Sequence, residues 1–269
     1  MFSLFFFLLG ACIGSFLNVI IYRYNTGMTI NGRSQCFSCG RQLRWFDMFP
    51  IVSFLTFRGR CRTCKSKISW QYPLVELITA ILFVAVFSVD GFSSALIFDL
   101  VIFCVLIVMT VYDIRHKIIP DRLVVIFVVV GLAKMLLPLM HGGDFSVLNF
   151  LAGFVFFVPF YLLWKVSNGK WIGLGDGKLA IGIGAFLGLS LGLTAIVVGF
   201  WAGALFGLSY LGLQRICDSA WFSRTWLGLF FARNSLTMKS EIPFAPFLIL
   251  GVLIVFFSGF NLFLIGSFL

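Results

Sequence analysis

The chain has 269 residues, of which 61% are hydrophobic and only 11% are charged, and its mean hydropathy is +1.07. This composition excludes an ordinary soluble globular domain. It predicts an all-helical protein that crosses a membrane several times, because a spanning helix needs roughly 20 mostly apolar residues. The net charge of +10 does not favour a nucleic-acid partner, since the basic residues are dispersed among loops.

About eight apolar segments are predicted to be transmembrane helices. The sixth and seventh are separated by only a weak Leu-Gly break and can also be read as one long bent helix. The first has no basic residues before it, so we expect a membrane helix and not a cleaved signal peptide. The predicted spans are 2–22, 74–89, 95–112, 122–140, 147–164, 179–190, 193–213 and 244–267.

The basic residues predict the orientation of these spans. All lysines and arginines except Lys134 lie in four loops, at 23–72, 113–122, 165–178 and 214–241. With eight spans the four loops share one side, which the positive-inside rule assigns to the cytoplasm, and both termini lie outside. We therefore expect a multi-pass membrane protein, surrounded by lipid. Lys134 lies inside the fourth span, and we expect its side chain to extend toward the outer interface.

The segments predict three parts of the chain. Residues 1–22 form the first transmembrane helix, residues 23–72 form a cytoplasmic module, and residues 73–269 form a membrane bundle. The module contains two C-x2-C knuckles, which together can supply four thiolates to a tetrahedral zinc ion. The knuckle residues are Cys36, Cys39, Cys61 and Cys64.

The expected zinc ion is structural. Four protein ligands leave no position for water, and the metal would hold together a small module that has little core of its own. The reducing cytoplasm disfavours disulfides between these cysteines. The alternative is four reduced cysteines in a disordered basic loop.

Two aspartates lie at the ends of predicted spans and, with eight spans, at the same cytoplasmic depth. Asp113 ends the third span in VMTVYDIRHKIIPD, and Asp176 opens the sixth in GLGDGK. Two carboxyl groups in one confined site do not both ionise easily, so one proton is retained. The ionised group can then take a proton from water while the protonated group polarises a carbonyl, which is aspartyl-protease chemistry. Either aspartate alone is also explained as a helix-end residue that faces headgroups or pairs with Arg115 or Lys178.

Three glycines surround Asp176, at Gly173, Gly175 and Gly177. Glycine permits close approach of another backbone, so we expect a substrate peptide to lie against them as an extended strand. Asp99 is about 21 Å from Asp113 along an ideal helix axis, which excludes it from the same site.

Several segments together resemble one family along nearly the whole chain, the bacterial type IV prepilin peptidases of pilus and type II secretion systems. The resemblance is carried by the paired knuckles and by GSFLNVIIYR at 14–23, GRCRTCKSKISWQYPLVEL at 59–77, DIRHKIIPD at 113–121, GLGDGK at 173–178 and EIPFAPFL at 241–248. It implies a GxGD-type aspartyl endopeptidase with Asp113 and Asp176 as the catalytic pair. The implied substrate is a prepilin or pseudopilin, whose basic leader is cut after a glycine at the cytoplasmic membrane face.

The resemblance also implies a second activity. Family members with the large cysteine-containing loop methylate the exposed amino group from S-adenosylmethionine, and this chain has that loop. Glu76 would then serve methyl transfer or bind the basic residues of the leader, or else pair with a nearby arginine. No motif locates the methyl-donor site.

Two positions depart from the family pattern. The first knuckle lacks a commonly found proline, and Ala245 replaces a glycine often seen in the last motif, which leaves substrate preference open.

Two other functions fit parts of the pattern. Tyr112-Asp113 with GLGD is also typical of presenilin-type intramembrane proteases, although the basic cysteine module has no place there. A transporter or a zinc-stabilised membrane scaffold would use the aspartates as a proton or cation relay.

Overall fold

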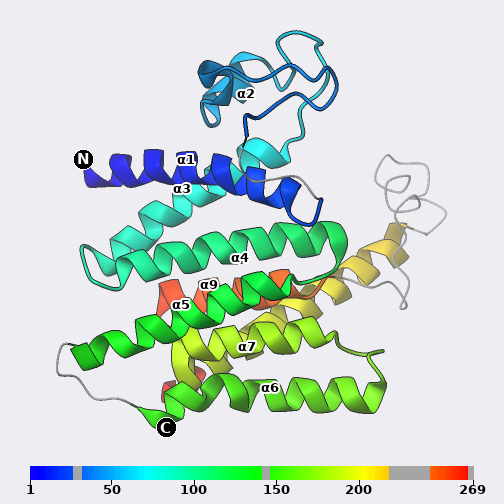
Figure 1. Ribbon diagram of the computed structural model, residues 1–269. Helices are drawn as coiled ribbons and strands as arrows, with labels where there is room; N and C mark the ends of the chain where they lie inside the picture. The colour runs from blue at the N-terminus through cyan, green and yellow to red at the C-terminus, as the bar shows by residue number, and fades with distance from the viewer. Residues whose placement is uncertain (27–31, 141–145, 218–242, 266–269) are drawn as a thin grey trace. The chain divides into compact units, whose positions relative to one another are not determined.

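The computed structural model describes residues 1–26, 32–140, 146–217 and 243–265, and in these residues every named element is helical (Figure 1). The predicted all-α class is thus confirmed. The short elements are η1 (Trp45–Met48), α2 (Val52–Thr56) and α10 (Leu262–Ile265). The longer helices are α1 (Phe2–Arg23), α3 (Gln71–Asp90), α4 (Leu96–His116), α5 (Asp121–Met140), α6 (Val147–Ser167), α7 (Leu174–Cys217) and α9 (Ala245–Ser258).

Six of the described helices are long and apolar enough to cross a membrane, so the chain is a multi-pass membrane protein. They are α1, α3, α4, α5, α6 and α7, and α9 is a shorter apolar helix. The arrangement differs from the eight predicted spans in two places. Helix α7 covers both the sixth and the seventh predicted span, and the last predicted span ends early, at Ser258. Gly259 follows it in the left-handed conformation, with φ +64°, and so stops the helix.

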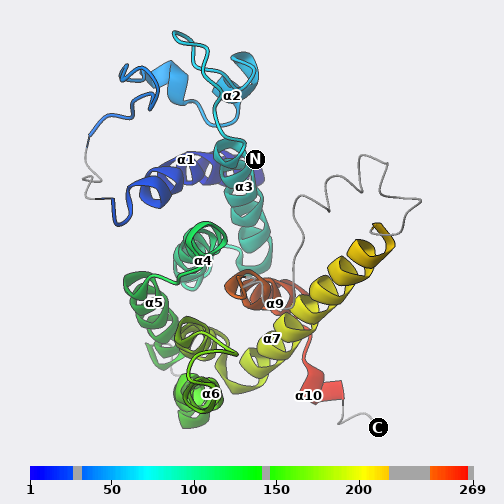
Figure 2. The same ribbon diagram turned by 90° about the vertical axis from the view of Figure 1, so that its right-hand side faces the viewer.

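A kink at Gly188 divides α7 into two arms (Figure 2). Gly188 has φ +75° and ψ −169°, a conformation that glycine adopts readily. The side chain of Asn149, on α6, accepts a hydrogen bond from the Leu189 backbone N–H at 3.0 Å. This bond satisfies an amide that the kink would otherwise leave unpaired. The predicted break after Ser190 is therefore placed slightly too late.

The chain divides into two compact units: residues 1–112 with 122–145, and residues 113–121 with 146–269. In the first unit α1 packs closely on α3. A Cβ added at Gly14 would lie 2.7 Å from the Glu76 Cα, and one at Gly10 would lie 2.8 Å from the Ala80 Cα. Small residues allow membrane helices to approach in this way. Asn18 adds a hydrogen bond from its Nδ2 to the Tyr72 carbonyl at 3.1 Å.

Also in the first unit, a buried ion pair joins α4 to α5. The Lys134 Nζ lies 2.6 Å from the Asp99 Oδ1, and Asp99 has no exposed surface. Asp99 lies in the first turn of α4, so the expected extension of Lys134 toward the outer interface stays a prediction. A buried carboxylate is costly unless a cation pairs with it, and the lysine supplies that cation. This pairing accounts for Asp99 without any catalytic role.

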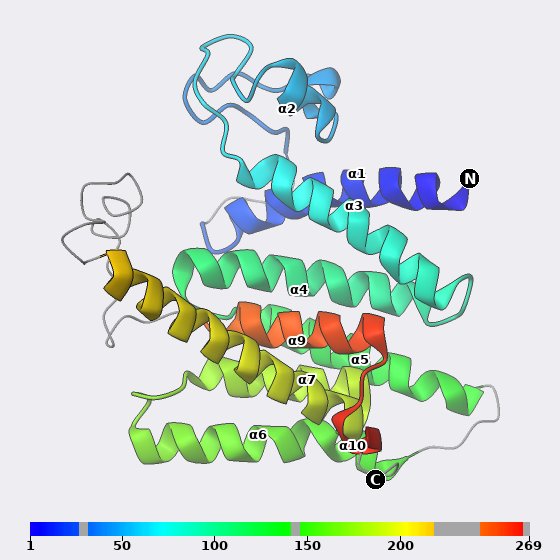
Figure 3. The same ribbon diagram turned by 180° about the vertical axis from the view of Figure 1, so that it is seen from behind.

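In the second unit α7 packs on α6 through its first arm and on α9 through its second arm (Figure 3). Glycines lie at both crossings. A Cβ added at Gly184 would come 2.6 Å from the Gly153 Cα of α6. A Cβ added at Gly199 would come 2.9 Å from the Leu248 Cα of α9. These crossings fix the position of α7 relative to α6 and α9.

We expect Gly251→Ala to destabilise the second unit. A Cβ at Gly251, on α9, would overlap the Ala195 carbonyl oxygen and lie 2.8 Å from the Gly199 backbone nitrogen, so α9 would have to move away from α7. Overpacking of this kind costs about 1–3 kcal/mol. The midpoint of thermal unfolding of the protein in detergent should fall. The matched control is Gly207→Ala on α7, where a Cβ meets nothing within 4 Å. Equal midpoints for the two variants would contradict this packing.

Candidate active site and metal site

Asp113 lies in the last turn of α4 and meets the first residue of α9. The Asp113 side chain is buried, with 4% of the residue exposed, and accepts a hydrogen bond from the Ala245 backbone N–H. The first N–H groups of a helix have no partner within it and attract negative charge. Asp113 thus provides a hydrogen-bond acceptor for an N–H group at the start of α9. Its Oδ2 has no hydrogen-bond partner among the described residues. A buried polar atom without a partner is costly, and this oxygen is available to a proton or to a substrate.

Asp176 lies in the first turn of α7, and its carboxylate accepts a hydrogen bond from the Gly173 backbone N–H, just before the helix begins. An acidic side chain that bonds back to the amide before a helix is half of a capping box. The hydrogen bond to Gly173 agrees with the explanation of Asp176 as a helix-end residue. That explanation does not account for the second carboxyl group, of Asp113, that interacts with it.

The two aspartates belong to the same compact unit, and their carboxyl groups interact electrostatically. Each is fixed by a backbone N–H at the start of a different helix, α9 for Asp113 and α7 for Asp176. Neither group is held by a cation in the described contacts. Lys178, which the sequence offered as a partner for Asp176, instead has its Nζ 2.6 Å from the Asp121 Oδ1. Asp121 and Lys178 both belong to the second unit, so this ion pair lies within that unit.

The three glycines of the GLGDG segment have different surroundings. A Cβ at Gly175 would lie 3.3 Å from the Ile119 side chain, and one at Gly177 would lie 3.0 Å from the Phe160 Cβ. Both glycines thus face side chains of this chain. Gly173 is exposed, and a Cβ there would meet no other residue closer than the Asp176 Oδ2, at 3.6 Å. The expectation of an extended substrate strand stays a prediction, and Gly173 is the glycine best placed for it.

Sequence reasoning missed Ala245 as a backbone partner of Asp113. The sequence Phe244-Ala245-Pro246 carries a signal for it, because proline is favoured in the first turn of a helix and marks where N–H groups lack partners. The side chain of Ala245 is completely buried. What the sequence could not give is which side chain would meet this helix start.

Glu76 lies in the first unit, on α3, with 7% of the residue exposed. Its Oε2 accepts a hydrogen bond from the Ile51 backbone N–H at 2.7 Å, and the Ser15 hydroxyl is a second partner. The pairing with a nearby arginine that the sequence allowed is replaced here by neutral donors. Its roles toward the leader or toward methyl transfer stay predictions.

The four cysteines of the paired knuckles gather into one cluster, with their sulfur atoms all within 4.8 Å of one another. The Cys36 and Cys64 sulfurs are 3.8 Å apart. A disulfide needs about 2.05 Å, whereas two sulfurs of a tetrahedral zinc site with Zn–S bonds of about 2.3 Å are separated by about 3.8 Å. The donor set and its spacing fit zinc.

The two knuckles share one backbone pattern. In the first knuckle the Cys36 N–H donates to the Arg41 carbonyl, and the Gly40 N–H donates to the Cys36 carbonyl. In the second knuckle the N–H groups of Cys61 and Lys65 make the two equivalent hydrogen bonds. Backbone N–H groups of Cys39 and Ser38 lower the pKa of the Cys36 thiol to about 6. The Ser66 hydroxyl and backbone lower the pKa of the Cys64 thiol. Thiolates are the form that binds metal. Cys39 differs, because burial and the neighbouring Cys36 and Cys64 thiols raise its pKa to about 11.

The protein is a multi-pass helical protein that has two interacting carboxyl groups at helix ends and a four-cysteine cluster in a separate unit. These features define a membrane protein that can carry out acid–base chemistry. The Bacterial Peptidase A24 N-terminal domain family matches residues 8–89, and the Type IV leader peptidase family matches residues 100–208. The chain belongs to the type IV leader peptidase family, as the resemblance implied.

Several relatives are named prepilin leader peptidase/N-methyltransferase. The one from Myxococcus xanthus is 38% identical over 69% of this chain and 56% of its own length. The one from Xanthomonas campestris is 31% identical over 94% of this chain and 90% of its own length. The one from Bacillus subtilis is 30% identical over 94% of this chain and 93% of its own length. No solved structure matches the chain.

Proposed function

We propose that the chain is a membrane aspartyl endopeptidase that removes the basic leader of type IV prepilins and pseudopilins after a glycine. The observation that carries this proposal is the pair of interacting carboxyl groups of Asp113 and Asp176 in one compact unit. Family membership and the names of the relatives support the same substrate class.

In this proposal the two carboxyl groups hold one proton between them. The ionised group takes a proton from water, and the water oxygen bonds to the scissile carbonyl carbon while the protonated group polarises the carbonyl oxygen. When the carbon–nitrogen bond breaks, the departing amine takes a proton from the pair. The N–H groups of Ala245 and Gly173 hold the carboxyl groups in place during these steps. Gly173, beside Asp176, would receive the extended substrate.

We further propose that the new N-terminal amine is methylated, as the names of the relatives state for those proteins. When bound, S-adenosylmethionine would supply the methyl group, and S-adenosylhomocysteine and a proton would be released. The zinc ion would be structural and held by the thiolates of Cys36, Cys39, Cys61 and Cys64. The proposed location is the bacterial inner membrane, with the basic loops and the aspartates at the cytoplasmic face and both termini outside.

Product mapping tests the proposed function. The purified protein in detergent is mixed with a prepilin and S-adenosylmethionine, and the products are measured by mass spectrometry. We expect a cut directly after the glycine that precedes the hydrophobic helix, and a mature N-terminus heavier by one methylene per methyl group. A cut within the helix would favour the presenilin-type reading. The absence of any cut would favour a transporter or scaffold. An unmodified N-terminal amine would overturn the proposal that the amine is methylated.

A further inference from the structure

Residues 32–70 of the cysteine module contact two membrane helices well inside the ends of those helices. The module lies beside α1 in Figure 1 and Figure 2, and does not continue the helix beyond its end. The Ile51 N–H donates to the Glu76 Oε2 at 2.7 Å, and the Ser15 hydroxyl of α1 is the second partner of Glu76. Glu76 follows the start of α3 by five residues, and Ser15 precedes the end of α1 by eight. These separations correspond to about 7.5 Å and about 12 Å along the helix axes.

The lengths of these two helices place the turn at Ile51 at the membrane boundary. Helix α1 has 22 residues and α3 has 20, so the two helices are about 33 Å and about 30 Å long. The hydrocarbon core is about 30 Å thick, so neither helix has surplus length that extends far into water, and any tilt shortens its reach. A segment that lies on a membrane inserts its apolar side chains about 5–10 Å into the boundary between headgroups and acyl chains. The turn lies at a comparable depth, where lipid and not bulk water surrounds the protein.

Four large apolar side chains are exposed on either side of this turn. Trp45 is 71% exposed, Phe49 52%, Val52 60% and Leu55 65%, and we call these four residues the interfacial patch. They come from η1, from α2 and from the turn between these two elements, which pack on each other. The rings of Trp45 and Phe49 are 5.7 Å apart, and Val52 and Leu55 are three residues apart on one face of α2. An exposed apolar patch of this kind marks a surface that another molecule or a membrane covers.

Exposed arginines border the interfacial patch. The guanidinium groups of Arg44 and Arg62 lie 5.9 Å and 5.2 Å from the centroid of the Phe46 ring, and Arg58 is the third residue after Leu55. None of these arginines forms an ion pair with an acid in the described part of the chain. The whole module contains nine lysines and arginines but one acid, which is paired with a different arginine. The border of the patch is thus suited to negative charge.

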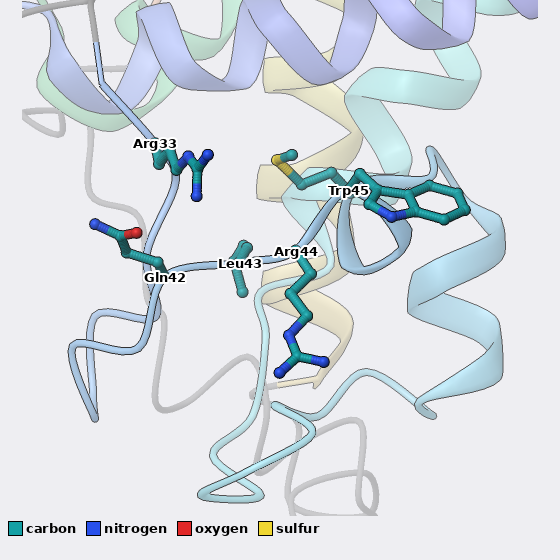
Figure 4. Close-up of a pocket in the computed structure, with 6 residues that line it drawn as sticks. Arg33, Gln42, Leu43, Arg44 and Trp45 are labelled. Carbon is teal, nitrogen blue, oxygen red and sulfur yellow. The ribbon is translucent and has the colours of Figure 1, made fainter.

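A hollow of about 480 Å³ lies where the patch meets these arginines, and Arg44, Trp45 and Met48 are among the residues that line it. Figure 4 shows the Trp45 ring and the Arg44 guanidinium extending in different directions from adjacent positions in the chain. Tryptophan is enriched at the level of lipid headgroups, and guanidinium groups bind phosphate. An apolar ring next to a separate cation therefore suits the boundary between acyl chains and phosphates.

We propose that the interfacial patch is seated in the lipid leaflet on its side of the membrane that the protein itself spans. The four apolar side chains insert among the acyl chains, and Arg44, Arg58 and Arg62 bind the phosphates of anionic lipids. The depth of the turn and the charge of the module select this occupant. A second copy of the chain would bring two basic modules together, and a basic leader peptide would be repelled by either one. The inference does not depend on the proposed peptidase or methyl-transfer activity.

A photoreactive side chain in the patch identifies what covers it. The full-length variant Leu55→p-benzoylphenylalanine is purified, checked for folding by size-exclusion chromatography, and reconstituted in vesicles of phosphatidylcholine with a minor share of phosphatidylglycerol. After irradiation, the mass of the intact protein gives the identity of the adduct. We expect the mass of the protein plus one lipid. The matched control is Thr63→p-benzoylphenylalanine, at an exposed position of the second knuckle outside the patch, which should form at least about fivefold fewer lipid adducts.

Two further variants of the probe-bearing protein test the role of the arginines. Replacing Arg44, Arg58 and Arg62 together by glutamine should reduce adducts with phosphatidylglycerol at least about fivefold. Replacing Arg60, Lys65 and Lys67 by glutamine removes the same charge from the second knuckle and should leave these adducts within about twofold. Equal losses in the two variants, or equal lipid adducts from the probes at positions 55 and 63, would overturn the inference. Cross-linked dimers would identify a second copy as the occupant, adducts with added prepilin would identify the substrate, and the absence of any adduct would indicate water. Each of these three outcomes would also overturn the inference.

Discussion

Asp113→Asn and Asp176→Asn are each expected to reduce leader cleavage by about 10³-fold or more, since positioned acid–base groups contribute about 10²–10⁴-fold each and both groups must act together. Asparagine keeps the size of the side chain and an oxygen that accepts the N–H of Ala245 or Gly173. The starts of α9 and α7 therefore keep their hydrogen bonds. What is lost is the ability to carry and exchange a proton. The measurement is the initial rate of prepilin cleavage in detergent, with equal amounts of folded protein.

The double variant distinguishes a shared site from two separate roles. Groups that act as a unit are not additive, so the double variant should be no slower than the slower single variant. Asp90→Asn, at the end of α3 in the other unit, serves as the control and should cleave at the normal rate. If the two rate reductions multiply in the double variant, or if either single variant still cleaves the prepilin, Asp113 and Asp176 do not act as a catalytic pair.

The helix bounds could be predicted to within a few residues for α1, α3, α5 and α6, because their lengths are set by the thickness of the membrane and their ends by loops rich in basic or turn residues. The kink in α7 could not be placed from the sequence. Residues 182–192 contain several glycines, and the choice of Gly188 depends on Asn149 reaching it from another helix. The partner of Lys134 was missed for the same reason, since the pairing with Asp99 exists only once α4 and α5 are packed.

Of the candidate site, the two charged groups could be predicted from the sequence. Asp113 and Asp176 lie at matching ends of their spans, and carboxylates are too costly in a membrane to be placed there at random. The backbone groups that fix them could not be predicted, because any helix start offers N–H groups and only tertiary packing selects Ala245 for Asp113. The hydrogen bond between Glu76 and Ile51 is a further case. It depends on a turn whose positive φ is unfavourable for isoleucine and so has no local signal.

Cys61→Ser is expected to abolish zinc binding and open the cysteine module. Cys61 is the buried member of the cluster, and its sulfur lies within 4.8 Å of the other three. Where a small module has little core, metal-binding free energy is largely folding free energy, of about 10–16 kcal/mol for structural zinc sites. The metal content should fall from about one zinc per chain to near zero. The segment from 23 to 72 contains nine lysines and arginines, so trypsin reports its opening directly. We expect cleavage in this segment to accelerate at least about tenfold, an effect that chelation of the unaltered protein should reproduce.

Cys104→Ser is the matched control, because Cys104 lies in α4, outside the cluster. It should retain zinc and resist trypsin as the unaltered protein does. The second unit, with Asp113 and Asp176, has its own helix crossings at Gly184 and Gly199, so those crossings should survive the loss of the metal. Full zinc content in Cys61→Ser would show that the metal is bound elsewhere. Unchanged trypsin resistance after zinc removal would show instead that the module folds without it, and the structural role of the ion would then fall even if the four thiolates bind it.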